Sequence, residues 1–225
     1  MTSISSTAPS LALCLIARDE EAFIEGCLRS AAEVVDELVV LDTGSSDTTR
    51  AIAATHGASV YRFEWCDDFA AARNAALAHV TADWVLILDA DERLATGAGA
   101  TIQAVIANED FDAAFLELHD AAATDATMED VLSGESRIGN PILLPRLFRR
   151  CGNLRWSGVV HETTSQWLME RPERVATTGA RIVHYGAVPE HRAALEKSSR
   201  NRRLLERRVI EEPDHPEPHR YLARS

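Results

Sequence analysis

Short apolar runs alternate with helix-forming segments over the first half of the chain, and this alternation limits the possible folds more than any other feature. The runs LALCLIA at residues 11–17 and ELVVLD at 37–42 are continuous and bounded by polar turns, as in strands buried on both faces. Residues 20–32 between them carry a helical apolar pattern. Parallel neighbouring strands need such a crossover. The sequence therefore predicts an α/β fold with a mostly parallel central sheet flanked by helices.

The same reasoning extends along the chain. Residues 119–140 are polar without a clear period, and we expect a mobile loop there. A long charged helix is expected from residue 190 to 211, broken by PDHPEP at 213–218. The other expected strands are 58–63, 83–91, 112–118, 142–150 and 181–186, and the other expected helices are 48–56, 69–79 and 98–107.

This pattern divides the chain into three parts. Residues 1–10 are rich in Ser and Thr and are expected to form a flexible N-terminal tail. Residues 11–188 are expected to form one folded domain with a single core. Residues 189–225 are expected to form a C-terminal helical extension.

The net charge of −12 is concentrated in the first part of the chain, where residues 1–100 hold 16 acidic and 6 basic side chains. This distribution argues against a nucleic-acid partner, which needs a basic surface. An acidic domain can still bind phosphates when a divalent cation lies between the carboxylates and the ligand. The arginines of the C-terminal helix are interspersed with glutamates, so we expect a solvated amphipathic helix whose Leu204 and Leu205 dock on the domain.

The cysteine and hydropathy patterns predict a cytoplasmic protein. The four cysteines form no C-x-x-C pair, which favours reduced thiols. No apolar run approaches the roughly 20 residues of a membrane-spanning helix, and residues 1–10 carry no basic residue of a secretory signal. We expect no stable membrane insertion, only transient contact with the inner face of the membrane.

Carboxylates follow two of the expected strands, where a parallel sheet binds its ligands. Asp89 and Asp91 come after an apolar run in LILDADE, and residues i and i+2 of an extended chain point the same way. Such a pair suits Mg²⁺ or Mn²⁺, which prefer oxygen ligands shared with phosphates. Asp42 ends another strand before a turn of small residues, where it can accept hydrogen bonds from a nucleoside. The alternative reading of the Asp89–Asp91 pair is a solvated acidic loop or a helix cap, and that of Asp42 is an ordinary strand-turn-helix with a capped start.

In combination, four segments covering residues 11–94 resemble the family 2 glycosyltransferases, which have the GT-A fold. A bacterial branch of that family carries W-x-G-x-x-HE, found here at 156–162, and HYG, found at 184–186. The stretch 197–223 also resembles this branch, in which it leads into tetratricopeptide-like repeats. The four segments are LALCLIARDEEAFIEGCLRSA, DELVVLDTGSSDTT, FEWCDDFAAARNAALA and DWVLILDADERL.

The resemblance implies a metal-dependent, inverting glycosyltransferase of the hexosyltransferase type. It would move a sugar from a nucleotide-sugar donor, expected to be a UDP-sugar, to a hydroxyl of a saccharide, glycolipid or peptide. Cell-envelope polysaccharide biosynthesis is the process expected for this branch. The resemblance assigns Asp42 to the nucleoside and Asp91 to Mn²⁺ or Mg²⁺, with Asp89 at the metal or reaching it through ribose or water.

Further roles follow from the later motifs. Arg73 and Asn74 match a pair near the donor site, although surface or capping roles fit them equally. Trp156 suits either stacking on a sugar or filling the core. His184 matches the place of a third metal ligand, or of a structural histidine.

Inversion requires a base near the acceptor hydroxyl, and Glu162 is the first choice with its neighbour His161 as the alternative. One position departs from the family pattern: many members read Asn-Glu-Glu after the first strand, where this chain has Asp19-Glu20-Glu21. Aspartate accepts hydrogen bonds but lacks the two amide donors, so the role of this position is in doubt.

Two other functions remain open. A catalytically silent, glycosyltransferase-like binding module would keep the fold without turnover. A sugar-phosphate nucleotidyltransferase would carry a Gly-rich, Arg-bearing loop after the first strand, and this chain has ARDEE without glycine there.

Overall fold

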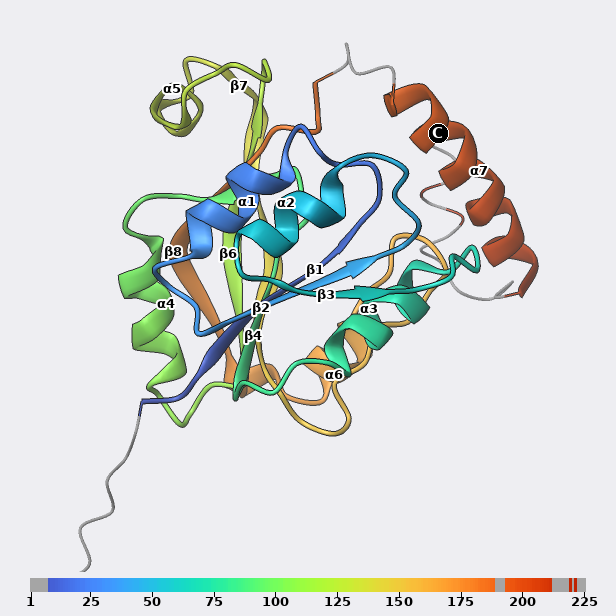
Figure 1. Cartoon of the computed structure of the whole chain (residues 1–225). Helices are drawn as coiled ribbons and strands as arrows, with labels where there is room; N and C mark the ends of the chain where they lie inside the picture. Colours follow the sequence, from blue (N-terminus) through green and yellow to red (C-terminus); the bar gives the residue numbers. More distant parts are fainter. Residues whose placement is uncertain (1–7, 189–192, 212–218, 220, 222–225) are drawn as a thin grey trace, which may run out of the picture.

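A single eight-stranded sheet forms the centre of the protein, with strand order β3-β2-β1-β4-β7-β6-β8-β5 (Figure 1). The computed structural model describes residues 8–188, 193–211, 219 and 221. The strands are β1 (Leu11–Ala17), β2 (Glu37–Asp42), β3 (Ser59–Arg62), β4 (Trp84–Ile87), β5 (Glu92–Leu94), β6 (Ala113–Ala121), β7 (Arg137–Arg149) and β8 (Val175–His184). The helices are α1 (Ile24–Ala31), α2 (Thr49–Thr55), α3 (Phe69–Leu77), α4 (Ala98–Ile106), α5 (Met128–Ser133), α6 (Ser165–Met169) and α7 (Ala193–Glu211), with a 3-10 turn at Pro172–Arg174.

The sheet is parallel where the sequence alternates between strand and helix. Strands β3, β2, β1 and β4 all run in the same direction, and β2 and β4 lie on opposite sides of β1. The order of strands therefore reverses beside β1, and ligands bind at the carboxyl ends of the strands at such a point. The predicted α/β architecture is confirmed.

Strand β1 is buried on both faces because an apolar layer covers each side of the sheet. Leu11, Leu13 and Leu15 pack with α1, α2 and α4 on one side. Ala12 and Cys14, which alternate with them, pack with α3 and α6 on the other. This arrangement explains why the strand reads as a continuous apolar run rather than an alternating one.

The second half of the sheet is largely antiparallel. Strand β7 runs antiparallel to both β4 and β6, β8 is parallel to β6, and β5 is antiparallel to β8. The Glu92–His184 pair of β5 and β8 brings the segment after β4 against the end of β8. Residues 92 positions apart in the sequence thus meet at the rim that holds Asp89 and Asp91.

The expected loop at residues 119–140 is wrong. Strand β6 continues to Ala121, α5 occupies part of the interval, and β7 begins at Arg137. Thr127 caps α5 by accepting a hydrogen bond from the Asp130 amide, and Gly134 ends the helix with a φ of +97°. The helix has only six residues, too short to show a clear apolar period.

Helix α7 packs against the domain, as expected from its leucines. Leu204 and Leu205 are buried against Val159 and Val160. Within the described residues, no helix has the length and apolar character needed to cross a bilayer. Most of the expected N-terminal tail, the first residues of the expected C-terminal helix and the expected break at 213–218 lie outside the described residues.

Candidate active site

Asp42 lies at the carboxyl end of β2 with its carboxylate buried. Its side chain accepts hydrogen bonds from the backbone N–H of Gly44 at 3.3 Å and of Ser45 at 3.1 Å. Arg50 of α2 donates to it at 2.9 Å. Burial works to raise the pKa of Asp42, but the hydrogen bonds from Ser45, Arg50 and Gly44 hold it below its usual value. Asp42 is therefore an ionised acceptor at the rim.

Asp19, the position that departs from the family pattern, acts as an acceptor. Its backbone has a φ of +52°, a left-handed conformation that Asp and Asn tolerate better than most residues. Its carboxylate accepts hydrogen bonds from the Ser46 N–H at 2.7 Å and the Ser46 hydroxyl at 3.0 Å. These contacts tie the turn after β1 to the turn after β2.

Two arginines hold Asp89. Arg73 of α3 donates to Oδ1 at 2.6 Å, and Arg146 of β7 donates to Oδ2 at 3.3 Å. Arg146 also forms an ion pair with Glu92. Desolvation opposes the ionised form of Asp89, but the two guanidinium groups outweigh it and hold its pKa well below the usual range. Burial raises the pKa of Glu92.

Glu162 lies in a closed loop, residues 157–163, which we call the Glu162 loop. Backbone hydrogen bonds of 2.9 Å in both directions between Ser157 and Thr163 close it. The Oε1 atom of Glu162 accepts a hydrogen bond of 2.6 Å from Nε of Arg73. Its Oε2 atom makes no hydrogen bond with the described residues, and the side chain is 13% exposed. One carboxylate oxygen thus remains for a ligand.

His161 points elsewhere. Its backbone is left-handed, with a φ of +49°, and its ring stacks on Tyr221 with 3.9 Å between the ring centroids. The two candidate bases are therefore separated: Glu162 joins the arginine and carboxylate cluster, while His161 faces the C-terminal extension. This geometry favours Glu162.

Asp91 and His184 meet at a glycine. The Nε2 atom of His184 lies 3.6 Å from Oδ2 of Asp91, and Nδ1 lies 2.7 Å from Oδ1 of Asp120. Burial works to lower the pKa of His184, but the carboxylates of Asp120 and Asp91 raise it to about 10. A Cβ on Gly186 would lie 1.9 Å from Oδ2 of Asp91, so only glycine fits there.

Asn74 and Trp156 contact each other. The Asn74 side chain donates to the Trp156 carbonyl and accepts from the Trp156 N–H, both at 2.9 Å. Trp156 is 6% exposed and its ring packs edge-on against Phe148, which also meets Trp167. Of the two readings of Trp156, the structure therefore favours core packing. Asn74 joins α3 to the start of the Glu162 loop.

A family model described as glycosyl transferase family 2 matches residues 12–172. The chain belongs to the family 2 glycosyltransferases. A TPR repeat-containing protein of Synechococcus elongatus is 34% identical over 95% of this chain and 51% of its own length. Glycosyltransferase SunS of Bacillus subtilis is 26% identical over 94% of this chain and 48% of its own length. The chain thus spans about half the length of these curated relatives.

Solved structures share the fold of this family 2 glycosyltransferase. Glucosyl-3-phosphoglycerate synthase of Mycobacterium tuberculosis, in complex with Mn²⁺, UDP and glucosyl-3-phosphoglycerate, has a TM-score of 0.56 at 19% identity. The match covers 88% of this chain and 77% of that one. TarS of S. aureus in complex with UDP has a TM-score of 0.53 at 17% identity, covering 80% and 59%. The predicted GT-A fold is confirmed.

The residues of this family 2 glycosyltransferase fit a divalent cation at Asp91 and His184. An oxygen and a nitrogen donor face each other at 3.6 Å, and the missing side chain of Gly186 lets the Asp91 carboxylate lie there. Asp120 holds the other ring nitrogen of His184, as a carboxylate commonly does for a metal-ligating histidine. The described residues do not bring three His, Cys, Asp or Glu side chains together as a complete ligand set. Asp89, also expected at the metal, instead contacts the two arginines.

Sequence reasoning missed three members of this cluster: Glu92, Asp120 and Arg146. The signal for Arg146 was present, because a lone arginine inside the apolar run ILLPRLF is costly unless carboxylates face it. Glu92 adjoins the aspartate pair in sequence, yet it is 2% exposed and needs the same arginine as its partner. Asp120 gave no signal, because it fell in the expected loop.

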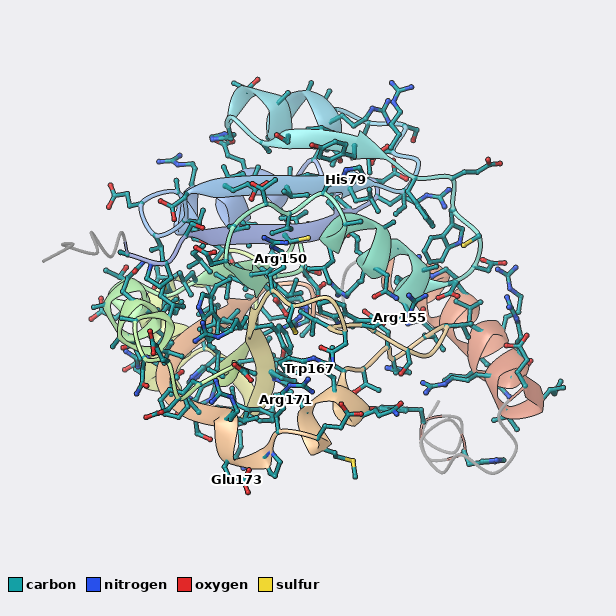
Figure 2. All side chains as sticks on the ribbon, turned by 90° about the horizontal axis from the view of Figure 1, so that it is seen from below. His79, Arg150, Arg155, Trp167, Arg171 and Glu173 are labelled. Carbon is teal, nitrogen blue, oxygen red and sulfur yellow. The ribbon has the colours of Figure 1, made fainter. Side chains whose placement is uncertain are left out.

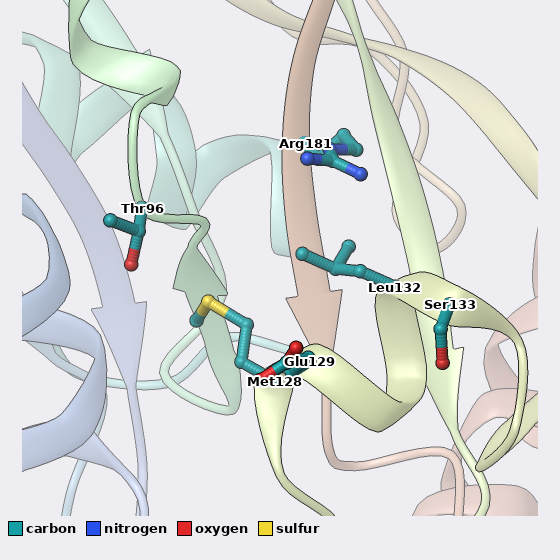
Figure 3. Close-up of a pocket in the computed structure, with 6 residues that line it drawn as sticks. All are labelled: Thr96, Met128, Glu129, Leu132, Ser133 and Arg181. Carbon is teal, nitrogen blue, oxygen red and sulfur yellow. The ribbon is translucent and has the colours of Figure 1, made fainter.

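A groove of about 550 Å³ lies between α5 and β8 and shares no lining residue with this cluster (Figure 3). Met128 and Leu132 of α5 supply apolar surface, and Arg181 supplies a positive charge from β8. Arg181 precedes His184 on the same strand. The groove is therefore separate from the arginine and carboxylate cluster.

Proposed function

We propose that this domain transfers a sugar from a nucleotide-sugar, most simply a UDP-sugar, to an acceptor hydroxyl with inversion at the anomeric carbon. The observation that carries the proposal is the juxtaposition of Asp91 and His184 around Gly186, on the rim that also holds Asp42. The bound UDP and Mn²⁺ of the M. tuberculosis synthase support the donor and metal classes. The acceptor is proposed to be a saccharide, glycolipid or peptide.

Asp42 is proposed to accept hydrogen bonds from the nucleoside. The small residues that follow it leave room for a base and ribose. Its ionised state at neutral pH makes it a strong acceptor, because charge-assisted hydrogen bonds are stronger than neutral ones.

Asp91 and His184 are proposed to hold Mn²⁺ or Mg²⁺, with Asp120 fixing the ring of His184. His184 must release a proton to do so, because only neutral imidazole binds a metal. A bound divalent cation would supply charge neutralisation for the departing diphosphate. Arg73 and Arg146 keep Asp89 ionised next to this position.

Glu162 is proposed to act as the base. Its Oε2 atom would take the hydroxyl proton of the acceptor as the acceptor oxygen bonds to the anomeric carbon. The bond from that carbon to the phosphate oxygen breaks in the same step, and the electron pair leaves with the nucleoside diphosphate. Arg73 holds Oε1 and so fixes the direction of the carboxylate.

The proposal is tested first by ligand-dependent thermal unfolding. UDP, GDP, dTDP, CMP and ADP are each added with and without Mn²⁺ to the wild type and to Asp91→Asn. We expect Mn²⁺-dependent stabilisation by UDP, reaching about 2.7 kcal/mol at 100 times the dissociation constant. The Mn²⁺-dependent part should be absent in Asp91→Asn.

Two results would count against the proposal. Equal stabilisation of the wild type and Asp91→Asn would remove Asp91 from the metal site. Nucleotide binding without sugar transfer to any of a broad acceptor panel would favour a catalytically silent binding module.

The four cysteines carry free thiols, which supports a proposed cytoplasmic site of action.

A further inference from the structure

Arg208 of α7 is buried beneath the Glu162 loop although it carries a charge. The residue is 1% exposed. Its guanidinium donates to the Val160 carbonyl at 2.8 Å and lies 3.4 Å from the His161 carbonyl as a second, weaker acceptor. A Cβ on Gly158 would lie 2.5 Å from Cζ of Arg208. The glycine of the W-x-G-x-x-HE motif is therefore the surface on which this arginine packs.

The Glu162 loop is held between two helices. On one side, Leu204 and Leu205 of α7 pack against Val159 and Val160. On the other, the Val159 carbonyl accepts a hydrogen bond of 2.9 Å from the N–H of Phe69, the first residue of α3. Helix α3 also carries Arg73, the partner of Glu162, so both ends of that ion pair depend on the position of this loop.

The loop contains a conformation that needs support. His161 is left-handed at a φ of +49°, a strained conformation that residues other than glycine seldom adopt. The carbonyls that receive Arg208 belong to this residue and to the one before it. The contact therefore falls at the point where the backbone turns toward Glu162.

We propose that Arg208 is a positioning residue, which fixes the Glu162 loop so that the Glu162 carboxylate faces Arg73 and the acceptor. The proposal rests on the proposed function for its catalytic consequence, although not for the loop contact itself. The proposal makes helix α7 part of the catalytic unit. Residues 11–188 alone would lack the arginine that supports the loop of the proposed base, Glu162.

The loop contact is tested by hydrogen exchange of the backbone amides in 158–162, which needs no substrate. Arg208→Lys is the main variant, because it keeps the buried charge but presents its donors from a single point rather than a planar fork. Arg207→Lys is the control, since Arg207 pairs with Glu211 on its own helix and is half exposed. We expect at least tenfold faster exchange in Arg208→Lys and no change in Arg207→Lys. Unchanged exchange in Arg208→Lys would overturn the contact.

The catalytic consequence is tested by steady-state kinetics of the same proteins. We expect Arg208→Lys to lower kcat by at least tenfold while the KM for donor and the Mn²⁺-dependent stabilisation by UDP stay as in the wild type. Arg208→Ala should lower kcat further than Arg208→Lys, so that lysine retains part of the function of the arginine. An unchanged kcat, or an equal loss of UDP binding, would overturn the positioning role.

Gly158→Ala keeps the test decisive if Arg208→Lys fails to fold. It changes the loop side of the same contact and also strains the backbone, because the φ of Gly158 is +93°. We expect the same split between kcat and donor binding. The double variant with Gly158→Ala and Arg208→Lys should lose less kcat than the two single losses predict together, because both changes act on one contact. Fully additive losses of kcat would count against the proposal. A wild type without any transfer activity would refute the proposed function, whereas the exchange experiment would still decide the loop contact.

Discussion

The guanidinium of Arg73 donates a hydrogen bond of 2.6 Å to the carboxylate of Glu162, although the residues lie 89 positions apart in the sequence. Arg73 is 8% exposed, and its other nitrogen reaches Asp89 at the same distance. One planar side chain thus fixes the spacing between the proposed base and the carboxylate pair after β4. Burial opposes its charge, but Asp89 and Glu162 raise the pKa of Arg73 above its usual value.

Replacing this guanidinium should damage catalysis more than its size suggests. Lysine presents its donors from one point and cannot span Asp89 and Glu162 together. We expect Arg73→Lys to lower the rate of sugar transfer about 100-fold at saturating donor. Initial rates measure the effect, with Arg155→Lys as the control because Arg155 is exposed (Figure 2). Equal rates in the two variants would contradict the spanning role.

The two candidate bases can be separated by substitution. Glu162→Gln keeps the shape of the side chain but removes its ability to take a proton, so we expect transfer to fall by about 10²- to 10⁴-fold. His161→Ala should change the rate by less than tenfold, because that ring faces Tyr221. Donor binding, measured by the stabilisation with UDP, should survive both changes. The reverse order of rates would identify His161 as the base.

Metal binding should be as sensitive to replacement of the glycine of the HYG segment as to replacement of the proposed metal ligands. In Gly186→Ala the new methyl group would displace the Asp91 carboxylate, so we expect the Mn²⁺-dependent part of the stabilisation by UDP to be lost. Gly179→Ala is the matched control, because it lies on β8 with open space around its Cβ position. Retained Mn²⁺ dependence in Gly186→Ala would place the cation elsewhere.

A carboxylate outside the site should give the protein part of its acid sensitivity. Hydrogen bonds from Arg174, with the charges of Arg149 and Arg171, hold the pKa of Asp112 below its ordinary value of 3.8. A lowered pKa stabilises the folded state above the unfolded value, and the contribution is lost as the pH falls through the folded value. We expect Asp112→Asn to lower the midpoint of thermal unfolding by a few degrees at pH 7. The difference should disappear as the pH falls below the ordinary value and through the lowered pKa of Asp112. Asp110→Asn is the exposed control, and a difference independent of pH would contradict the assignment.

The parallel half of the fold could be predicted from sequence because its signals are local. Strand β1 is buried on both faces, so every residue from Leu11 to Leu15 is apolar and the run stands out. The antiparallel half gives weaker signals. Strand β5 has three residues, and the first half of β7 is largely exposed, so neither differs in composition from a loop. Their pairing depends on distant strands, which a short window of sequence does not contain.

The candidate site shows the same division. Asp42 ends β2, and Asp89 and Asp91 lie between β4 and β5, so local sequence was enough to select them. The arginine partners of Asp89 and the orienting partner of His184 were not predictable, because they come from α3, β7 and β6. Arg146 turns Asp89 into half of an ion pair, and Asp120 orients His184. Both partners lie more than 30 residues from the motif they serve.

At the proposed nucleoside site, the hydrogen bond between Arg50 and Asp42 would make donor binding an exchange rather than a simple gain. A nucleoside that reaches Asp42 must share the carboxylate with a guanidinium already 2.9 Å away, and this guanidinium also binds the Ser45 carbonyl. The affinity for the nucleotide would then be the difference between two competing interactions. An internal competitor of this kind would keep the Asp42 carboxylate satisfied between turnovers and favour release of the spent nucleotide. Arg50 would thus help to set how long the product stays bound.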